Sequence, residues 1–165
     1  MAILINKENN VILKIDLIKN SYADIDNKRC DNENWITFTL CFECDEEKII
    51  YDAERKCTFN IGEIKNLINM INDLEKYCEN KISYNKQCFC PFENYFEICF
   101  YDTFEKNEIN VEFWVNYGEY TLGRKYGYDK GVRFVVDLQC LVSFANDLKI
   151  RFNEIISDSE NKSDT

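Results

Sequence analysis

Two stretches of the chain carry apolar residues at the three- and four-residue spacing of an amphipathic helix. From 61 to 79 the apolar stripe consists of Ile61, Ile64, Leu67, Ile68, Ile71, Leu74 and Cys78. From 138 to 156 it consists of Leu138, Leu141, Val142, Ala145, Leu148, Phe152 and Ile155. Asn60 with Glu63 three residues later matches a capping box, so we predict that the first helix begins directly after Asn60.

Elsewhere apolar and polar residues alternate, which is typical of half-buried antiparallel strands. The strongest alternations cover 35–43, 95–101 and 108–117. Weaker strand patterns cover 11–18, 49–51, 57–59, 120–124 and 132–136.

The predicted elements follow the order strands then helix, twice over, in halves of about 1–80 and 88–156. We therefore predict a single α+β domain over 1–156, with antiparallel sheets and two amphipathic helices, followed by a disordered polar tail over 157–165. Asn72-Asp73-Leu74 and Asn146-Asp147-Leu148 occupy similar places in the two helices, which leaves a βββα duplication open.

Composition narrows the function. The 165 residues include 20 Lys and Arg, 30 Asp and Glu and no His, which gives a net charge of −10. The absence of His excludes Ser–His, Cys–His and His–metal arrangements. The negative charge argues against general nucleic-acid binding, which depends on Lys and Arg at phosphates. We find no signal-peptide pattern and no membrane-spanning apolar run, so we expect a cytoplasmic protein without a membrane partner.

The chain has nine cysteines, an odd number, and we expect reduced, mostly buried thiols rather than a disulfide framework. Cys41, Cys44, Cys88 and Cys90 could in principle form a four-cysteine zinc site. Because residues three apart in a strand point to opposite faces, Cys41 and Cys44 fit that site poorly. We predict no cofactor and no metal, although metal binding by these four stays open. Pairs of carboxylate residues are scattered along this acidic chain, and such pairs are typical of a solvated protein surface. We therefore predict that the protein is not an enzyme.

A more informative pattern concerns aromatic residues that fall opposite the apolar register of the three strong strands. These residues share that register with several glutamates, and together they predict an outward sheet face for binding a protein partner. The predicted partner-binding residues are Trp35, Tyr95, Glu97, Tyr101, Glu108, Glu112 and Trp114. The alternative is that these aromatics form cross-strand pairs or cover the edge of the core. We expect Trp114→Ala and Glu112→Lys to weaken partner binding more than folding.

Several segments resemble the WapI-type immunity proteins of bacterial polymorphic toxin systems. Asp31-Asn-Glu-Asn-Trp35-Ile36-Thr-Phe is similar to the opening strand of that family. The helix at 64–77, the strand Pro91-Phe-Glu-Asn-Tyr-Phe-Glu-Ile98 and the strand at 109–115 follow in the family's order. The chain then ends on a strand, an Asp and a Leu-rich helix, from Val135 to Phe152. The resemblance covers about Val11 to Phe152, but this chain lacks the family's Pro after the strand glutamate and its Trp late in the first helix.

The resemblance implies a non-catalytic cytosolic immunity protein that binds and neutralises a cognate C-terminal toxin domain, of a basic, nuclease type. A second resemblance, in element order alone, is to the Whirly-type fold, whose members bind single-stranded nucleic acid; the acidic charge argues against that activity. The remaining alternative is an acidic protein-interaction or regulatory module of another bacterial system. Whether the protein is a monomer or a homodimer stays open.

Overall fold

The computed structural model describes residues 1–19, 24–26, 28–103, 105, 107–125 and 127–160. Its first antiparallel sheet, in the order β1-β2-β3-β4, contains β1 (Ala2–Ile5), β2 (Val11–Ile18), β3 (Trp35–Cys44) and β4 (Glu47–Tyr51). A short fifth strand, β5 (Thr58–Asn60), pairs with the beginning of β3. A 3₁₀ turn precedes β3 at Asp31–Glu33, and another follows β4 at Ala53–Arg55.

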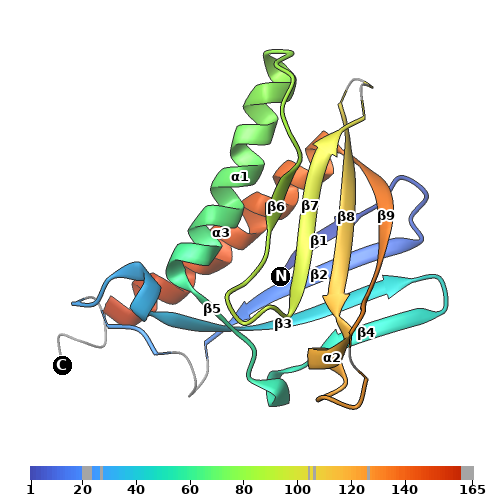
Figure 1. Ribbon diagram of the computed structural model, residues 1–165. Helices are drawn as coiled ribbons and strands as arrows, with labels where there is room; N and C mark the ends of the chain where they lie inside the picture. Colours follow the sequence, from blue (N-terminus) through green and yellow to red (C-terminus); the bar gives the residue numbers. More distant parts are fainter. Residues whose placement is uncertain (20–23, 27, 104, 106, 126, 161–165) are drawn as a thin grey trace.

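The second antiparallel sheet has the simple order β6-β7-β8-β9. Its strands are β6 (Gln87–Phe89), β7 (Phe96–Asp102), β8 (Glu108–Asn116) and β9 (Asp129–Asp137). In Figure 1 this sheet lies in front of the first one, and its strands cross those of the first sheet steeply. One face of the second sheet therefore points toward the first sheet and the other points outward.

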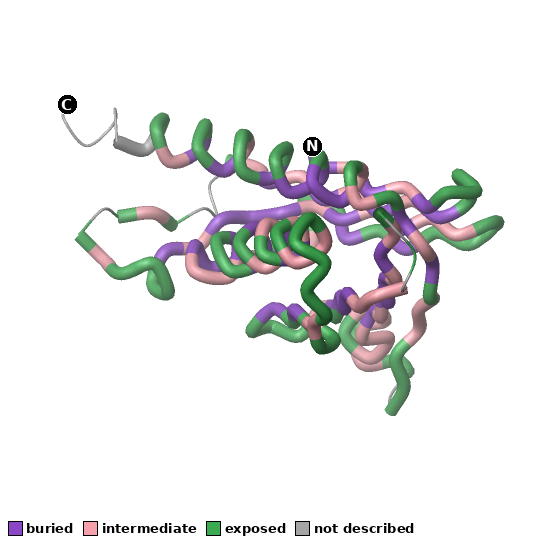
Figure 2. The backbone as a smooth tube through the Cα atoms, turned by 90° about the horizontal axis from the view of Figure 1, so that it is seen from above, coloured by how far each residue is buried: buried purple, intermediate pink, exposed green. Residues whose placement is uncertain are grey.

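Along the chain, each sheet is followed by a long helix: α1 (Ile61–Glu79) comes after the first sheet and α3 (Leu138–Glu160) after the second. They lie side by side on one flank of the molecule, and α3 also packs against β1 and β2 (Figure 1). Along α3 the buried positions face the strands and the exposed positions face away, as the amphipathic stripe requires (Figure 2). The fold is thus α+β, with two strand-rich halves that each end in a helix.

Apolar residues from both sheets and both helices form one core cluster. Aromatic rings join the sheets: the ring centroids of Phe42 and Phe113 lie 4.8 Å apart, and those of Phe38 and Phe96 lie 6.3 Å apart. Because α3 belongs to the second half of the chain but packs on strands of the first, neither half buries its apolar surface without the other.

The helix periodicity predicted α1 correctly, and its capping box is present: the Asn60 side chain accepts from the Glu63 N–H, and Glu63 accepts from the Asn60 N–H. The strands expected at 35–43, 95–101 and 108–117 are confirmed as β3, β7 and β8. Helix α3 extends to Glu160, beyond the expected end at 156, and residues 161–165 of the predicted tail lie outside the described residues.

The strand expected at 120–124 is wrong. A short helix, α2 (Tyr117–Tyr120), ends there, and the Thr121 hydroxyl donates back to the Tyr117 carbonyl over 2.7 Å. Leu122 and Gly123 then adopt φ values of 53° and 75°, which no extended strand contains. Strands β1 and β6 were not predicted, and they complete the two sheets at their edges.

Candidate functional site

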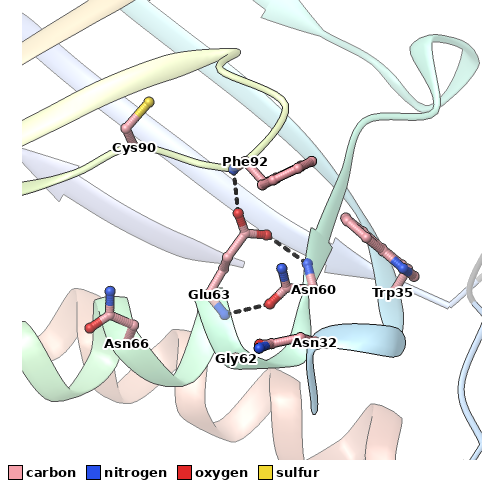
Figure 3. A pocket seen from close by; sticks show the side chains of 8 residues that line it. All are labelled: Asn32, Trp35, Asn60, Gly62, Glu63, Asn66, Cys90 and Phe92. Carbon is pink, nitrogen blue, oxygen red and sulfur yellow. Dashed lines mark hydrogen bonds between the residues drawn. The ribbon is translucent and has the colours of Figure 1, made fainter. Parts of the chain in front are cut away.

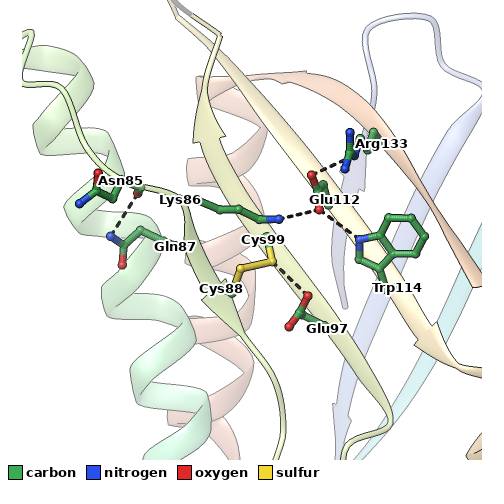
Figure 4. The surroundings of a disulfide bond; sticks show 9 residues. All are labelled: Asn85, Lys86, Gln87, Cys88, Glu97, Cys99, Glu112, Trp114 and Arg133. Atoms are coloured by element: carbon green, nitrogen blue, oxygen red, sulfur yellow. Dashed lines mark hydrogen bonds and ion pairs between the residues drawn. A yellow bond between two sulfur atoms is a disulfide. The ribbon is translucent and has the colours of Figure 1, made fainter. Parts of the chain in front are cut away.

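The outward face of the second sheet brings together the charged and aromatic side chains of three strands. In β7 and β8, Glu97 lies directly opposite Trp114, and Cys99 lies opposite Glu112, while Glu112 in turn lies opposite Arg133 of β9. Directly opposed residues of antiparallel strands project to the same side. We call this set the outer face; it consists of Tyr101 and of six residues drawn in Figure 4, which are Cys88, Glu97, Cys99, Glu112, Trp114 and Arg133.

Glu112 is the charged centre of the outer face and is only 5% exposed. Its carboxylate accepts from Lys86 Nζ at 2.7 Å and from Trp114 Nε1 at 3.2 Å, and Arg133 Nε lies 2.9 Å away (Figure 4). The hydrogen bond from Lys86, with Trp114 and the charge of Arg133, holds the pKa of Glu112 below its usual value, although burial acts in the opposite direction. The carboxylate is therefore ionised and neutralised within the protein itself.

This arrangement corrects our expectation for Glu112→Lys. Because Glu112 is buried beneath two cations, a lysine at this position would bring a third positive charge against Lys86 and Arg133. The substitution would then cost fold stability, and it cannot serve as a clean test of binding.

Gly131 lets β9 approach β8 closely at the edge of the outer face. It lies opposite Trp114, and a Cβ at this position would lie 1.9 Å from the Phe113 carbonyl oxygen. A side chain cannot be accommodated without a backbone shift, so glycine is required for this pairing of Trp114 with its neighbouring strand.

Cys88 and Cys99 face each other across β6 and β7 and form a disulfide, with their Cα atoms 4.1 Å apart. For these two cysteines the expectation of reduced thiols is wrong, whereas the other seven are free. Among the other cysteines, Cys57 alone is fully buried, so the thiols are also less buried than expected. The four-cysteine zinc site does not assemble, because Cys41 and Cys44 lie in the first sheet and Cys88 is bonded to Cys99.

The predicted binding residues do not all lie on one face. Glu97, Tyr101, Glu112 and Trp114 lie together on the outer face. Glu97 is exposed, whereas Tyr101 and Trp114 are half-buried. The pattern of alternation thus assigned the correct side of β7 and β8, but it could not show which other strands belong to the same sheet.

The other predicted residues lie elsewhere. Tyr95 precedes β7 and turns inward, where its ring meets Phe38 and Tyr51 edge-on at 5.8 Å, and burial raises its pKa. Glu108, at the beginning of β8, pairs with Lys7 and lines a separate cleft of about 620 Å³ near the end of α1. Trp35 begins β3 in the first sheet.

Trp35 lies beside a second feature, an open pocket of about 540 Å³ at the beginning of α1 (Figure 3). Glu63 connects two sides of this pocket: one carboxylate oxygen accepts from the backbone N–H of Asn60, and the other accepts from the backbone N–H of Phe92. The Phe92 side chain is 80% exposed. The lining residues are Asn32, Trp35, Asn60, Gly62, Glu63, Asn66, Cys90 and Phe92.

Sequence reasoning missed Lys86, Arg133 and the pairing of Cys88 with Cys99. Arg133 could have been found, because it alternates with Val132 and Phe134 in a segment already predicted as a strand. Lys86 and Cys88 gave no such signal, since β6 has only three residues and no clear alternation.

The fold and the outer face define an α+β protein with aromatic and charged side chains gathered on one exposed sheet face. The chain belongs to the Immunity protein WapI-like family, whose family model matches residues 3–154. No curated protein matches the chain significantly. In the described part of the chain, no helix combines the length and apolar content that a membrane crossing requires.

Proposed function

We propose that this protein binds and neutralises a cognate toxin domain of basic, nuclease type in the cytosol, and that it does so without catalysis of its own. The observation that carries the proposal is membership of an immunity protein family over nearly the whole chain. The net charge of −10 supports a basic partner, because opposite charge speeds association and disfavours wrong partners. Nucleases are basic where they hold RNA or DNA, and an acidic protein can occupy such a surface.

We further propose the outer face as the surface that contacts the toxin. Trp114 presents a half-buried aromatic ring directly opposite the exposed residue Glu97, a combination that suits a binding anchor next to a basic group, and Tyr101 adds a second half-buried ring further along β7. Glu112 orients this face because its carboxylate accepts hydrogen bonds from the Trp114 indole and the Lys86 ammonium. Trp35, Tyr95 and Glu108 are left out of the proposed surface because they lie apart from it.

Co-expression tests the function. The C-terminal ~150 residues of the protein encoded immediately upstream, about one domain, would be expressed with and without this chain. We expect toxicity that this protein relieves, together with a complex that co-purifies. Toxicity that the chain fails to relieve, or a harmless upstream fragment, would overturn the proposal in favour of an interaction module of another system.

Two matched pairs of variants test the surface. Glu97→Lys and Glu46→Lys change the charge equally, but Glu46 lies in the hairpin between β3 and β4. Trp114→Ala and Trp35→Ala each remove one indole, one from each sheet. We expect only Glu97→Lys and Trp114→Ala to weaken the complex, by at least about tenfold, as truncated interface anchors do. Equal effects within either pair would place the interface elsewhere.

A further inference from the structure

The Cys88–Cys99 pair lies beside a third group that can bind metal. Glu97 is two residues before Cys99 in β7 and projects to the same side, and one of its carboxylate oxygens lies 3.4 Å from Cys99 Sγ (Figure 4). The ligand atoms of Cys88, Cys99 and Glu97 all lie within 4.8 Å of one another. Cys88 and Glu97 are exposed whereas Cys99 is fully buried, so an ion would reach the group from the side of Cys88 and Glu97.

A disulfide and a metal site are alternative states of such a pair. A thiol reductant cleaves the S–S bond: two reductant thiols are oxidised to their own disulfide, and two electrons and two protons pass to Cys88 and Cys99. The reduced pair remains opposed across β6 and β7, because the strand pairing Gln87↔Phe100 and Phe89↔Ile98 flanks it on both sides.

We propose that the reduced protein binds a zinc ion through Cys88, Cys99 and Glu97. The ion replaces the two thiol protons, which are released to solvent, and forms two Zn–S bonds and one bond to a Glu97 oxygen. Water fills the fourth tetrahedral position. The site needs no histidine, which this chain lacks.

The distances and donor types fit this ion. Tetrahedral zinc with Zn–S bonds of about 2.3 Å separates its ligand atoms by less than about 4 Å, so small side-chain rotations bring the three groups into place. Two thiolates with one carboxylate favour zinc over magnesium or calcium, which prefer all-oxygen ligands.

Glu112 lies next to this group, but it is not one of the proposed ligands. Glu112 lies directly opposite Cys99 and holds Lys86 and Arg133 on the same face, at 2.7 Å and 2.9 Å. Glu112 itself remains paired with these cations and is not a ligand.

The test uses Co²⁺ as a spectroscopic probe of the reduced, full-length protein under anaerobic conditions. We expect a thiolate-to-cobalt charge-transfer band that saturates at one Co²⁺ per chain and disappears when Zn²⁺ is added. The oxidised protein, with the disulfide intact, should give no such band.

Variants separate this site from the other thiols. Cys88→Ser should abolish the band, and it is preferred to Cys99→Ser because Cys88 is exposed whereas Cys99 is fully buried. Cys90→Ser and Cys41→Ser, which leave the three proposed ligands in place, should retain the band. Glu97→Gln should weaken Zn²⁺ binding by at least about tenfold while leaving both thiols.

The proposal is overturned if the reduced protein gives no band, or if Cys88→Ser retains it. It is also overturned if Glu97→Gln binds Zn²⁺ as tightly as the unsubstituted protein, since two thiols alone would then account for binding. None of these measurements involves the toxin, so they are independent of the proposed immunity function.

Discussion

Glu112 shows how a strand residue in an outward register can still be buried. Alternation in β8 directs it away from the core, but Lys86, Trp114 and Arg133 cover it from three sides. The carboxylate thus connects β8 to β9 and to the segment that leads into β6. Its role in the isolated protein is to hold the outer face together. We therefore expect substitution of Glu112 to lower the free energy of unfolding.

Replacing Glu112 by Gln tests this role. Because both cations are partly exposed and can be solvated, we expect the free energy of unfolding at pH 7 to fall by only about 1–2 kcal/mol. The folded-state pKa of Glu112 lies below its unfolded value of about 4.3, so its stabilisation is complete above that pH and is lost as pH falls through the folded-state pKa. Urea denaturation at several pH values measures both effects.

The difference in stability between the unsubstituted protein and the Glu112→Gln variant should therefore shrink on acidification below about pH 4.3. Glu97→Gln is the matched control, because Glu97 is an exposed glutamate on the same face. A loss from Glu97→Gln as large as that from Glu112→Gln, or a difference that does not change with pH, would contradict this account.

At the scale of elements, the beginning of α1 is defined locally and was therefore predictable. Asn60 and Glu63 exchange their two hydrogen bonds, 2.9 Å and 2.7 Å long, within one turn of chain. Strands β1 and β6 were not predictable in the same way. They have four and three residues, and they form only because a partner strand and the core lie beside them. A strand was predicted at 120–124, but the positive φ values of Leu122 and Gly123 form a turn there instead.

Asn60→Ala removes the cap and should cost about 1 kcal/mol of the free energy of unfolding, since the Glu63 N–H loses its partner. The control is Asn66→Ala, an exposed position within the same helix. Because alanine is the better helix former, that substitution should be neutral or slightly stabilising. Thermal or urea denaturation of the two variants measures the difference, and equal stabilities would show that the cap contributes nothing.

At the scale of the whole molecule, the sequence could not show that the strands form two sheets rather than one. Alternation gives the side of a strand on which a residue lies, but not the sheet to which the strand belongs. For this reason Trp35 and Trp114 were expected on one face, although β3 and β8 lie in different sheets and meet through Phe42 and Phe113. Likewise the disulfide depends on β6, which has no sequence signal of its own.

The position of the two tryptophans, one in each sheet, lets the cooperativity of the fold be measured directly. Trp114→Phe leaves Trp35 as a reporter on the first sheet, and Trp35→Phe leaves Trp114 on the second. Because α3 packs on β1 and β2 and the core cluster spans both halves, we expect one cooperative transition. In each variant, the fluorescence midpoint in urea should equal the midpoint from far-ultraviolet circular dichroism.

Each variant is compared with its own circular dichroism, because Trp114→Phe also removes the hydrogen bond to Glu112 and lowers the overall stability. A shared shift of both signals therefore leaves the conclusion unchanged. If instead the Trp35 signal and the Trp114 signal departed from circular dichroism in opposite directions, the two sheets would unfold separately. The halves would then be independent units joined by α3, and the single core would not be what couples them.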